Sequence, residues 1–86
     1  SELEIVNPLG LHARAAAKFV KISGSFGADI RVAKGEMDVS GGSIMGLMML
    51  AAGIGQDVTV STSGRQAEEA MMAIVALVAE KFGEAD

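Results

Sequence analysis

The sequence predicts an α+β fold: an open-faced β-sandwich in which a four-stranded antiparallel sheet carries three helices on one face. Three observations lead to this fold class. Four short segments alternate apolar with polar residues, which is typical of strands with one buried and one wet face. Three longer segments place apolar residues at helical spacing. These segments follow the order βαββαβα, and a chain of 86 residues has room for one domain, residues 1–86.

Four strands are expected from the alternating segments. The first is ended by Asn7–Gly10, because Pro8 cannot donate to a neighbouring strand and Gly10 tolerates positive φ. The second and third are joined at Lys34-Gly35, which predicts a tight hairpin turn. The alternating apolar residues are, in order, Leu3 and Ile5, Ile30 and Val32, Met37 and Val39, and Val58 and Val60.

Three helices are expected between and after these strands. Gly24 ends the first and Gly83 ends the third. Ser43 is the expected N-cap of the second, and Ser63 with Gln66 three residues later predicts a capping box for the third. The expected helices span His12–Ser23, Ile44–Ala52 and Gly64–Phe82.

Composition excludes several classes of protein. The net charge of −4 and the absence of Tyr and Trp argue against a nucleic-acid-binding protein. No apolar run approaches the ~20 residues of a membrane-spanning helix, so no membrane insertion is expected. The opening Ser-Glu-Leu-Glu predicts a strand rather than a signal peptide. The lack of cysteine fits a reducing cytoplasm, where we expect the protein, and fits an exported protein almost as well. Charge is uneven: residues 1–43 hold five basic and five acidic side chains, residues 44–86 two basic and six acidic.

The single histidine, His12, stands at the expected start of the first helix. The first backbone N–H groups of a helix, here those of Ala13, Arg14 and Ala15, have no intrahelical acceptor, and the helix dipole adds partial positive charge. A phosphoryl group carried on the ring would be stabilised there. The dipole also disfavours the protonated ring, and a neutral ring nitrogen is a nucleophile. The guanidinium of Arg14 can reach phosphoryl oxygens.

A plainer interpretation fits the same spacing. His12 can be a polar N-cap and Arg14 a solvated surface residue, since His-x-Arg triplets are common. A metal site is not expected, because one histidine without clustered carboxylates supplies too few ligands. No cofactor is expected either.

A basic stripe is expected along the first helix, where Arg14, Lys18 and Lys21 stand at i, i+4 and i+7. The functional interpretation is a docking surface for acidic partners. The alternative is an ordinary solvated helix face.

The second helix contains no charged residue, so it is either fully buried or shows an apolar patch. Full burial is difficult in so small a domain, and we expect Ile44, Leu47 and Met48 to form an exposed partner-docking patch. The alternative is that these residues belong to the core.

Two segments resemble the signatures of the histidine-containing phosphocarrier (HPr) family of the bacterial phosphotransferase system. Gly10–Arg14 is similar to the family's active-site signature, and Gly42–Met48 is similar to the segment around a regulatory serine, here Ser43. The resemblance extends over essentially the whole chain. Lys18–Val20 and Ala51-Ala52 are more similar to the nitrogen-branch relatives, called NPr, than to sugar-branch members.

The resemblance implies a phosphoryl relay, not an enzyme with its own turnover. Enzyme I would phosphorylate Nδ1 of His12, and the phosphoryl group would pass to enzyme IIA domains. An HPr kinase/phosphorylase would act on Ser43, and the carrier is expected to be a monomer. Two positions depart from the family: Ala15 replaces a usual proline, and Gly42 replaces a usual lysine, which bears on recognition of Ser43 by the kinase.

Other function classes remain open from sequence. One is a regulatory binding domain whose phosphorylation state at His12 or Ser43 controls a partner enzyme or transcription factor. Another is a ferredoxin-like ligand- or RNA-binding module, for which the acidic charge and the absence of Tyr and Trp disfavour RNA.

Overall fold

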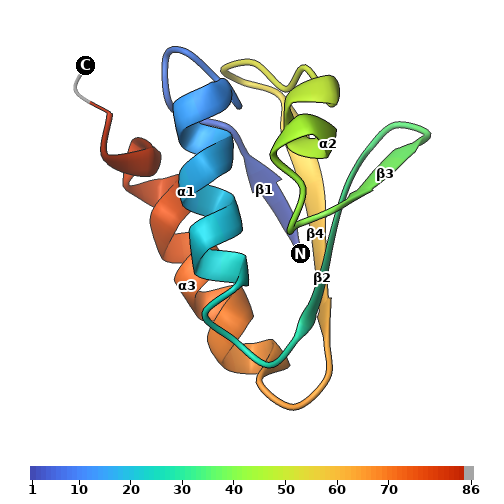
Figure 1. The fold of residues 1–86 in the computed structure, drawn as a ribbon. Coiled ribbons are helices and arrows are strands. Elements are labelled where there is room, and N and C mark those ends of the chain that lie inside the picture. The colour runs from blue at the N-terminus through green and yellow to red at the C-terminus, as the bar shows by residue number, and fades with distance from the viewer. Residues whose placement is uncertain (85–86) are drawn as a thin grey trace.

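The fold has the expected order βαββαβα, followed by a short 3-10 turn, η1 (Figure 1). The computed structural model describes residues 1–84. Within them, no helix is long and apolar enough to cross a membrane. The elements are β1 (Glu2–Glu4), α1 (Ala13–Ser23), β2 (Asp29–Lys34), β3 (Met37–Ser40), α2 (Ile44–Met49), β4 (Asp57–Ser63), α3 (Ala67–Ala79) and η1 (Lys81–Gly83).

The four strands form one sheet in the order β1-β4-β2-β3, and every neighbouring pair is antiparallel. Leu3 lies opposite Val58, and Val32 lies opposite both Val60 and Val39. The three helices cover one face of this sheet (Figure 1). The predicted open-faced sandwich is therefore confirmed.

The core lies between the sheet and the helices. In β2 and β4 the predicted alternation is observed, with apolar residues buried and their neighbours mostly exposed. The helices close the core with Phe19 from α1, Leu47 from α2 and Ile74 from α3, all almost completely buried. Burial of side chains of this size contributes about 1.5–3 kcal/mol each.

Helix α2 is shorter than expected and ends at Met49 rather than Ala52. Lys34 supplies the reason, because its Nζ donates to the carbonyl oxygens of Leu50 and Ala51, at 3.0 and 3.3 Å. Ala51 then adopts a left-handed conformation, with φ of 51°. This turns the chain toward the segment that precedes α1.

The expected capping box of α3 is wrong. Gln66, not Ser63, is the N-cap, and its side chain caps no helical N–H group. Its Oε1 instead accepts the backbone N–H of Gly27 at 2.7 Å, which ties the start of α3 to the loop before β2. A long-range contact has replaced the local one that the spacing suggested.

Helix α3 also ends earlier than expected, at Ala79 rather than Phe82. Lys81, Phe82 and Gly83 follow with φ of 58°, 55° and 73°, so three successive residues are left-handed. Phe82 is thereby turned into the core, and its carbonyl oxygen accepts a hydrogen bond from Nζ of Lys18 at 2.6 Å. The chain beyond η1 runs back toward the start of α1.

Candidate functional site

His12 caps the N-terminus of α1, as predicted. Its backbone is extended, with φ −77° and ψ 179°, and its Nδ1 accepts the backbone N–H of Arg14 at 3.3 Å. Among residues 1–84, no acceptor is found for the backbone N–H groups of Ala13 and Ala15. Ala15 is completely buried, so the unpaired N–H group of Ala13 and the positive end of α1 are what lie next to this edge of the imidazole ring.

The loop before His12 is held against the segment after α2. The N–H of Leu11 donates to the carbonyl oxygen of Ala52 at 2.9 Å. Gly10 permits this approach, because its φ is +67° and a Cβ there would lie 2.5 Å from the same carbonyl oxygen. Glycine is therefore required at this position, and its backbone fixes where α1 begins.

The other edge of the His12 ring meets a carboxylate, since Nε2 lies 2.8 Å from Oε2 of Glu84. A carboxylate oxygen accepts hydrogen bonds, so Nε2 carries a proton. Nδ1 accepts the Arg14 N–H, so Nδ1 carries a lone pair. The two contacts together select the neutral Nε2–H tautomer and leave Nδ1 as the nucleophilic nitrogen.

Glu84 is fixed by two further donors: Nδ2 of Asn7 at 2.9 Å and the backbone N–H of Leu9 at 3.0 Å. Partial burial raises the pKa of Glu84. The hydrogen bonds that Asn7, Leu9 and the His12 ring donate to the carboxylate outweigh this effect, so the pKa lies below its ordinary value. Glu84 is therefore ionised at neutral pH.

A surface hollow of about 710 Å³ opens over this arrangement. The exposed Arg14 makes no side-chain hydrogen bond or ion pair within the described part of the chain, so its guanidinium can turn into the hollow. Lys18 is different, because it is half-buried and bound to the Phe82 carbonyl oxygen. The hollow is lined by Leu9, His12, Ala13, Arg14, Lys18, Gly83 and Glu84.

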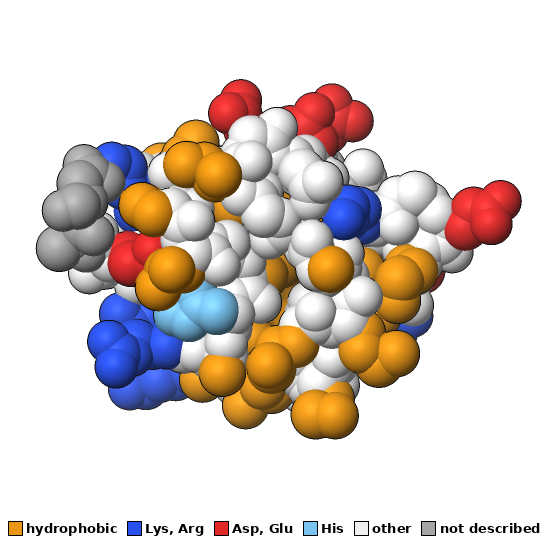
Figure 2. Space-filling view, turned by 90° about the horizontal axis from the view of Figure 1, so that it is seen from above, with side chains coloured by type: hydrophobic (Ala, Val, Ile, Leu, Met, Phe, Trp, Pro, Cys, Tyr) orange, Lys and Arg blue, Asp and Glu red, His pale blue; other side chains and the backbone are white. Residues whose placement is uncertain are grey.

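The surroundings of the ring combine charge and apolar surface. Figure 2 shows Lys and Arg side chains gathered on one side of the histidine and hydrophobic side chains on the other. Lys21 is exposed. Ile44 and Met48 are also exposed, and 40 % of the surface of each is accessible. The prediction that Leu47 is an exposed docking residue is wrong, because Leu47 is 0 % exposed and forms the core contact of α2.

Methionines take the place expected of Leu47. Met45 and Met49 are exposed, and they extend the surface begun by Ile44 and Met48. Their flexible thioether side chains suit a surface that adapts to different partners. We call these four residues, Ile44, Met45, Met48 and Met49, the α2 patch.

Comparison with known proteins identifies the family. The family model described as "PTS HPr component phosphorylation site" matches residues 1–80. The chain belongs to the PTS HPr family. The phosphocarrier protein HPr of Cupriavidus necator is 49 % identical over 82 residues, which cover 95 % of this chain and 92 % of that protein. The phosphocarrier protein NPr of Shewanella violacea is 44 % identical over 84 residues, covering 98 % and 92 %.

Solved HPr structures share the fold. A crystal structure of HPr from Thermoanaerobacter tengcongensis superposes with a TM-score of 0.94 at 43 % identity, covering all of this chain and 97 % of that one. The relatives of this HPr-family chain bear both the HPr and the NPr name, so the expected likeness to the nitrogen branch stays a prediction.

The two departures from the family pattern are accommodated locally. Ala15 is completely buried in the first turn of α1, which is intact without proline. Gly42 is exposed, and a Cβ there would make only an ordinary contact with Oγ of Ser40, at 3.5 Å. Ser43 is the N-cap of α2, as predicted, and its Oγ accepts the N–H of Gly46 at 3.0 Å.

Glu84 is the residue that sequence reasoning missed. It lies 72 positions from His12, and no local pattern connects the two. Gly83 was the one usable signal, since a glycine after a helix indicates a change of direction.

Within residues 1–84, no group of three or more His, Asp or Glu side chains could hold a metal ion.

Proposed function

We propose that this HPr-family protein carries a phosphoryl group on Nδ1 of His12, accepting it from enzyme I and passing it to enzyme IIA domains. The observation that supports this role most directly is the placement of the ring. Nε2 is held by Glu84, while Nδ1 faces the N-terminus of α1. The nucleophilic nitrogen and the donors for an incoming anion are thus on the same side. The relay places the protein in the cytoplasm.

The chemistry requires one bond to form and one to break. The Arg14 N–H gives up its hydrogen bond to Nδ1, the lone pair of Nδ1 attacks the phosphorus, and the bond between phosphorus and the donor's leaving group breaks with its electron pair. The proton on Nε2 stays in place, so the phosphorylated ring gains positive charge. The Glu84 carboxylate balances that charge, and the N–H group of Ala13 and the Arg14 guanidinium, both residues of the hollow, bind the phosphoryl oxygens.

The relay is tested by incubation with enzyme I and phosphoenolpyruvate. We expect a gain of one phosphoryl group in the intact mass, labile in acid and stable in base. Transfer onward is then measured by adding an enzyme IIA domain and following loss of that mass. A chain that is never phosphorylated under these conditions would contradict the proposal.

Replacing Glu84 by glutamine should slow phosphorylation of His12 about tenfold, because a charge-assisted hydrogen bond to the ring becomes a neutral one. Nitrogen NMR of the ring should show the Nε2–H tautomer less dominant than in the wild type. The variant should also lose one acid-sensitive part of its stability. Because folding lowers the pKa of Glu84, its carboxylate stabilises the folded state at pH values above the pKa that this group has in the unfolded chain. This contribution is lost as the pH falls through the lower pKa of the folded state.

The matched control is Glu80→Gln, which removes the same charge from an exposed residue outside the hollow. It should leave the tautomer and the phosphorylation rate unchanged. If Glu84→Gln keeps the wild-type rate and the wild-type tautomer, the carboxylate only holds the segment after η1 against Asn7 and Leu9.

Ser43→Asp should slow phosphorylation of His12 without lowering the melting temperature. Aspartate caps a helix as well as serine does, and the positive end of α2 favours its charge. The charge would lie beside Ile44 and Met48, where a partner must bury apolar surface. The reduction in rate should come from weaker binding of enzyme I.

Ser43→Asn is the control, because asparagine keeps the cap and adds no charge. If both variants are phosphorylated like the wild type, Ser43 is only a cap here and carries no regulation. A marked fall in the melting temperature of the aspartate variant would instead contradict the capping geometry.

A further inference from the structure

Helix α3 has a second apolar face, which points to solvent. Its inner face buries Ala70, Ile74 and Val78. On the outer side Met72 is 73 % exposed and Val75 39 % exposed, and Ala76 and Ala79 are exposed as well. A surface helix normally places polar residues opposite its buried stripe, so this face lacks the expected solvated surface.

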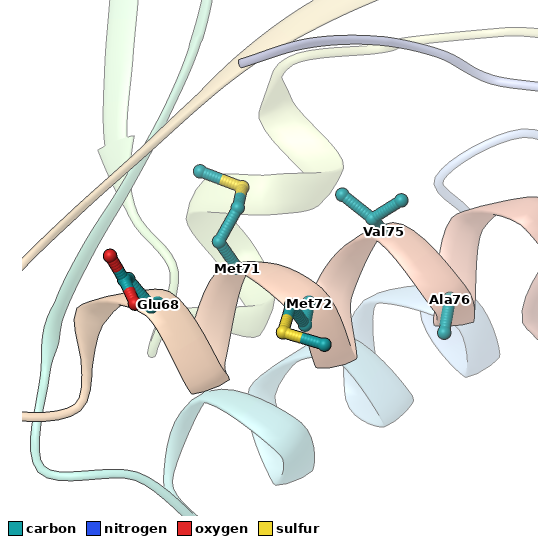
Figure 3. A pocket seen from close by; sticks show the side chains of 5 residues that line it. All are labelled: Glu68, Met71, Met72, Val75 and Ala76. Atoms are coloured by element: carbon teal, nitrogen blue, oxygen red, sulfur yellow. The ribbon is translucent and has the colours of Figure 1, made fainter.

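The outer face is shaped as a shallow groove of about 570 Å³ (Figure 3). Met71 and Val75 project together from one side of α3, and Ala76 projects from the other. The lining residues, Glu68, Met71, Met72, Val75 and Ala76, follow the spacing i, i+3, i+4, i+7 and i+8. This is the spacing of ridges and grooves against which a second helix packs. We call this surface the α3 groove.

The charged residues of α3 and its C-cap, Glu80, have one sign, and the only cations near them in sequence lie beyond the two ends of the helix. Glu68 lines it, and Glu69 and Glu80 are exposed near its two ends. Residues 67–80 contain no lysine or arginine. Arg65 precedes the helix and Lys81 lies in the turn beyond it.

A second copy of this chain fits the groove poorly. Helix α3 has 13 residues and is about 20 Å long, too short to supply the ~1,200 Å² or more that a stable dimer interface buries. Two α3 helices packed in either orientation would also bring glutamates at their ends together, and like charges disfavour the contact.

We propose that the α3 groove binds an amphipathic helix of a partner protein, one whose apolar stripe is flanked by lysine or arginine. The apolar stripe fills the groove between Met71, Met72, Val75 and Ala76, and the flanking cations face the glutamates. This partner is chemically distinct from one that binds the α2 patch, whose four residues are all uncharged. Helix α1 packs against both α2 and α3 and lies between them (Figure 1), so both surfaces can be occupied at once.

Two synthetic peptides test the assignment. Both are helical, about 14 residues long, with leucine at i, i+3, i+4, i+7 and i+11. One carries lysine at the remaining positions and the other glutamate. Each is titrated into the 86-residue protein at low salt, and backbone amide shifts are followed by NMR. We expect the lysine peptide to shift amides of residues 68–79 and the glutamate peptide to leave them unchanged.

Variants separate the apolar and the charged parts. Met72→Ser should weaken binding of the lysine peptide about five- to tenfold, whereas Met37→Ser, the same change at an exposed site on β3, should have no effect. Glu68→Gln should weaken binding about two- to fivefold, and Glu36→Gln, which changes net charge equally at the β2–β3 turn, should not.

Three results would overturn the proposal. In the first, the lysine peptide shifts amides of α2 rather than α3, or shifts none. In the second, the control variants Met37→Ser and Glu36→Gln weaken binding as much as Met72→Ser and Glu68→Gln do, which would indicate that the peptide does not recognise the α3 groove. In the third, the α3 amides shift with protein concentration in the absence of peptide, which would assign the groove to self-association.

Discussion

His12→Ala should abolish phosphoryl acceptance completely, because the chain contains no other histidine. The fold should survive. The substitution removes the N-cap of α1 and the contact with Glu84, and loss of a cap costs about 1 kcal/mol. The measurement is the intact mass after incubation with enzyme I and phosphoenolpyruvate, together with a thermal unfolding curve. Phosphorylation of this variant at the wild-type level would place the acceptor elsewhere.

His12→Asn separates the chemistry from the cap. Asparagine is a good N-cap but its amide is not a nucleophile, so α1 should keep its stability while phosphorylation is still lost. If both variants unfold, the alanine result would reflect the fold rather than the nucleophile. A folded asparagine variant that is not phosphorylated would therefore assign the loss to the missing nucleophile rather than to the missing cap.

Gly10→Ala should lower the free energy of unfolding by about 2–4 kcal/mol, the largest stability effect expected at the site. The left-handed backbone disfavours alanine. The new Cβ would also lie 2.5 Å from the carbonyl oxygen of Ala52 and 2.9 Å from Cα of Gly53. Those atoms belong to the backbone, so the loop before His12 must move away and phosphorylation should slow as well. Urea unfolding measures the first effect and the phosphorylation rate the second.

Gly35→Ala is the matched control for the steric part. Gly35 also has positive φ, +60°, but a Cβ there would meet nothing within 4 Å. It should lose only the conformational contribution of about 1 kcal/mol, with no change in phosphorylation. Equal destabilisation of the two variants would show that the approach of Gly10 to Ala52 is unimportant.

Local patterns predicted most of the fold. The alternation of Ile30 with Arg31 and of Val58 with Thr59 marked the wet and buried faces of the sheet, because side-chain direction in a strand depends only on sequence spacing. Helix ends were predicted less well. Lys34 shortens α2 and Gly27 occupies the side chain of Gln66, and both contacts come from distant segments.

In the candidate site, too, local features were predicted and long-range contacts were not. The N-cap position of His12 follows from its neighbours in sequence and was predicted. Its Glu84 partner depends on three left-handed residues, two of which, Lys81 and Phe82, are not glycine. Burial of Phe82 favours that turn, and burial is a property of the whole fold. The burial of Leu47 has a similar origin, because the composition of α2 does not reveal which of its apolar residues faces the sheet.

The sheet order has a consequence for folding. β4 is the last strand in the sequence, yet it lies between β1 and β2. The first 56 residues therefore contain β1 without the strand that it pairs with in residues 1–84, and the remainder contains β4 without either strand that it pairs with. Neither portion holds a complete sheet, so residues near opposite ends of the chain must come together before the core closes. We therefore expect that neither portion folds independently and that unfolding is a single cooperative transition.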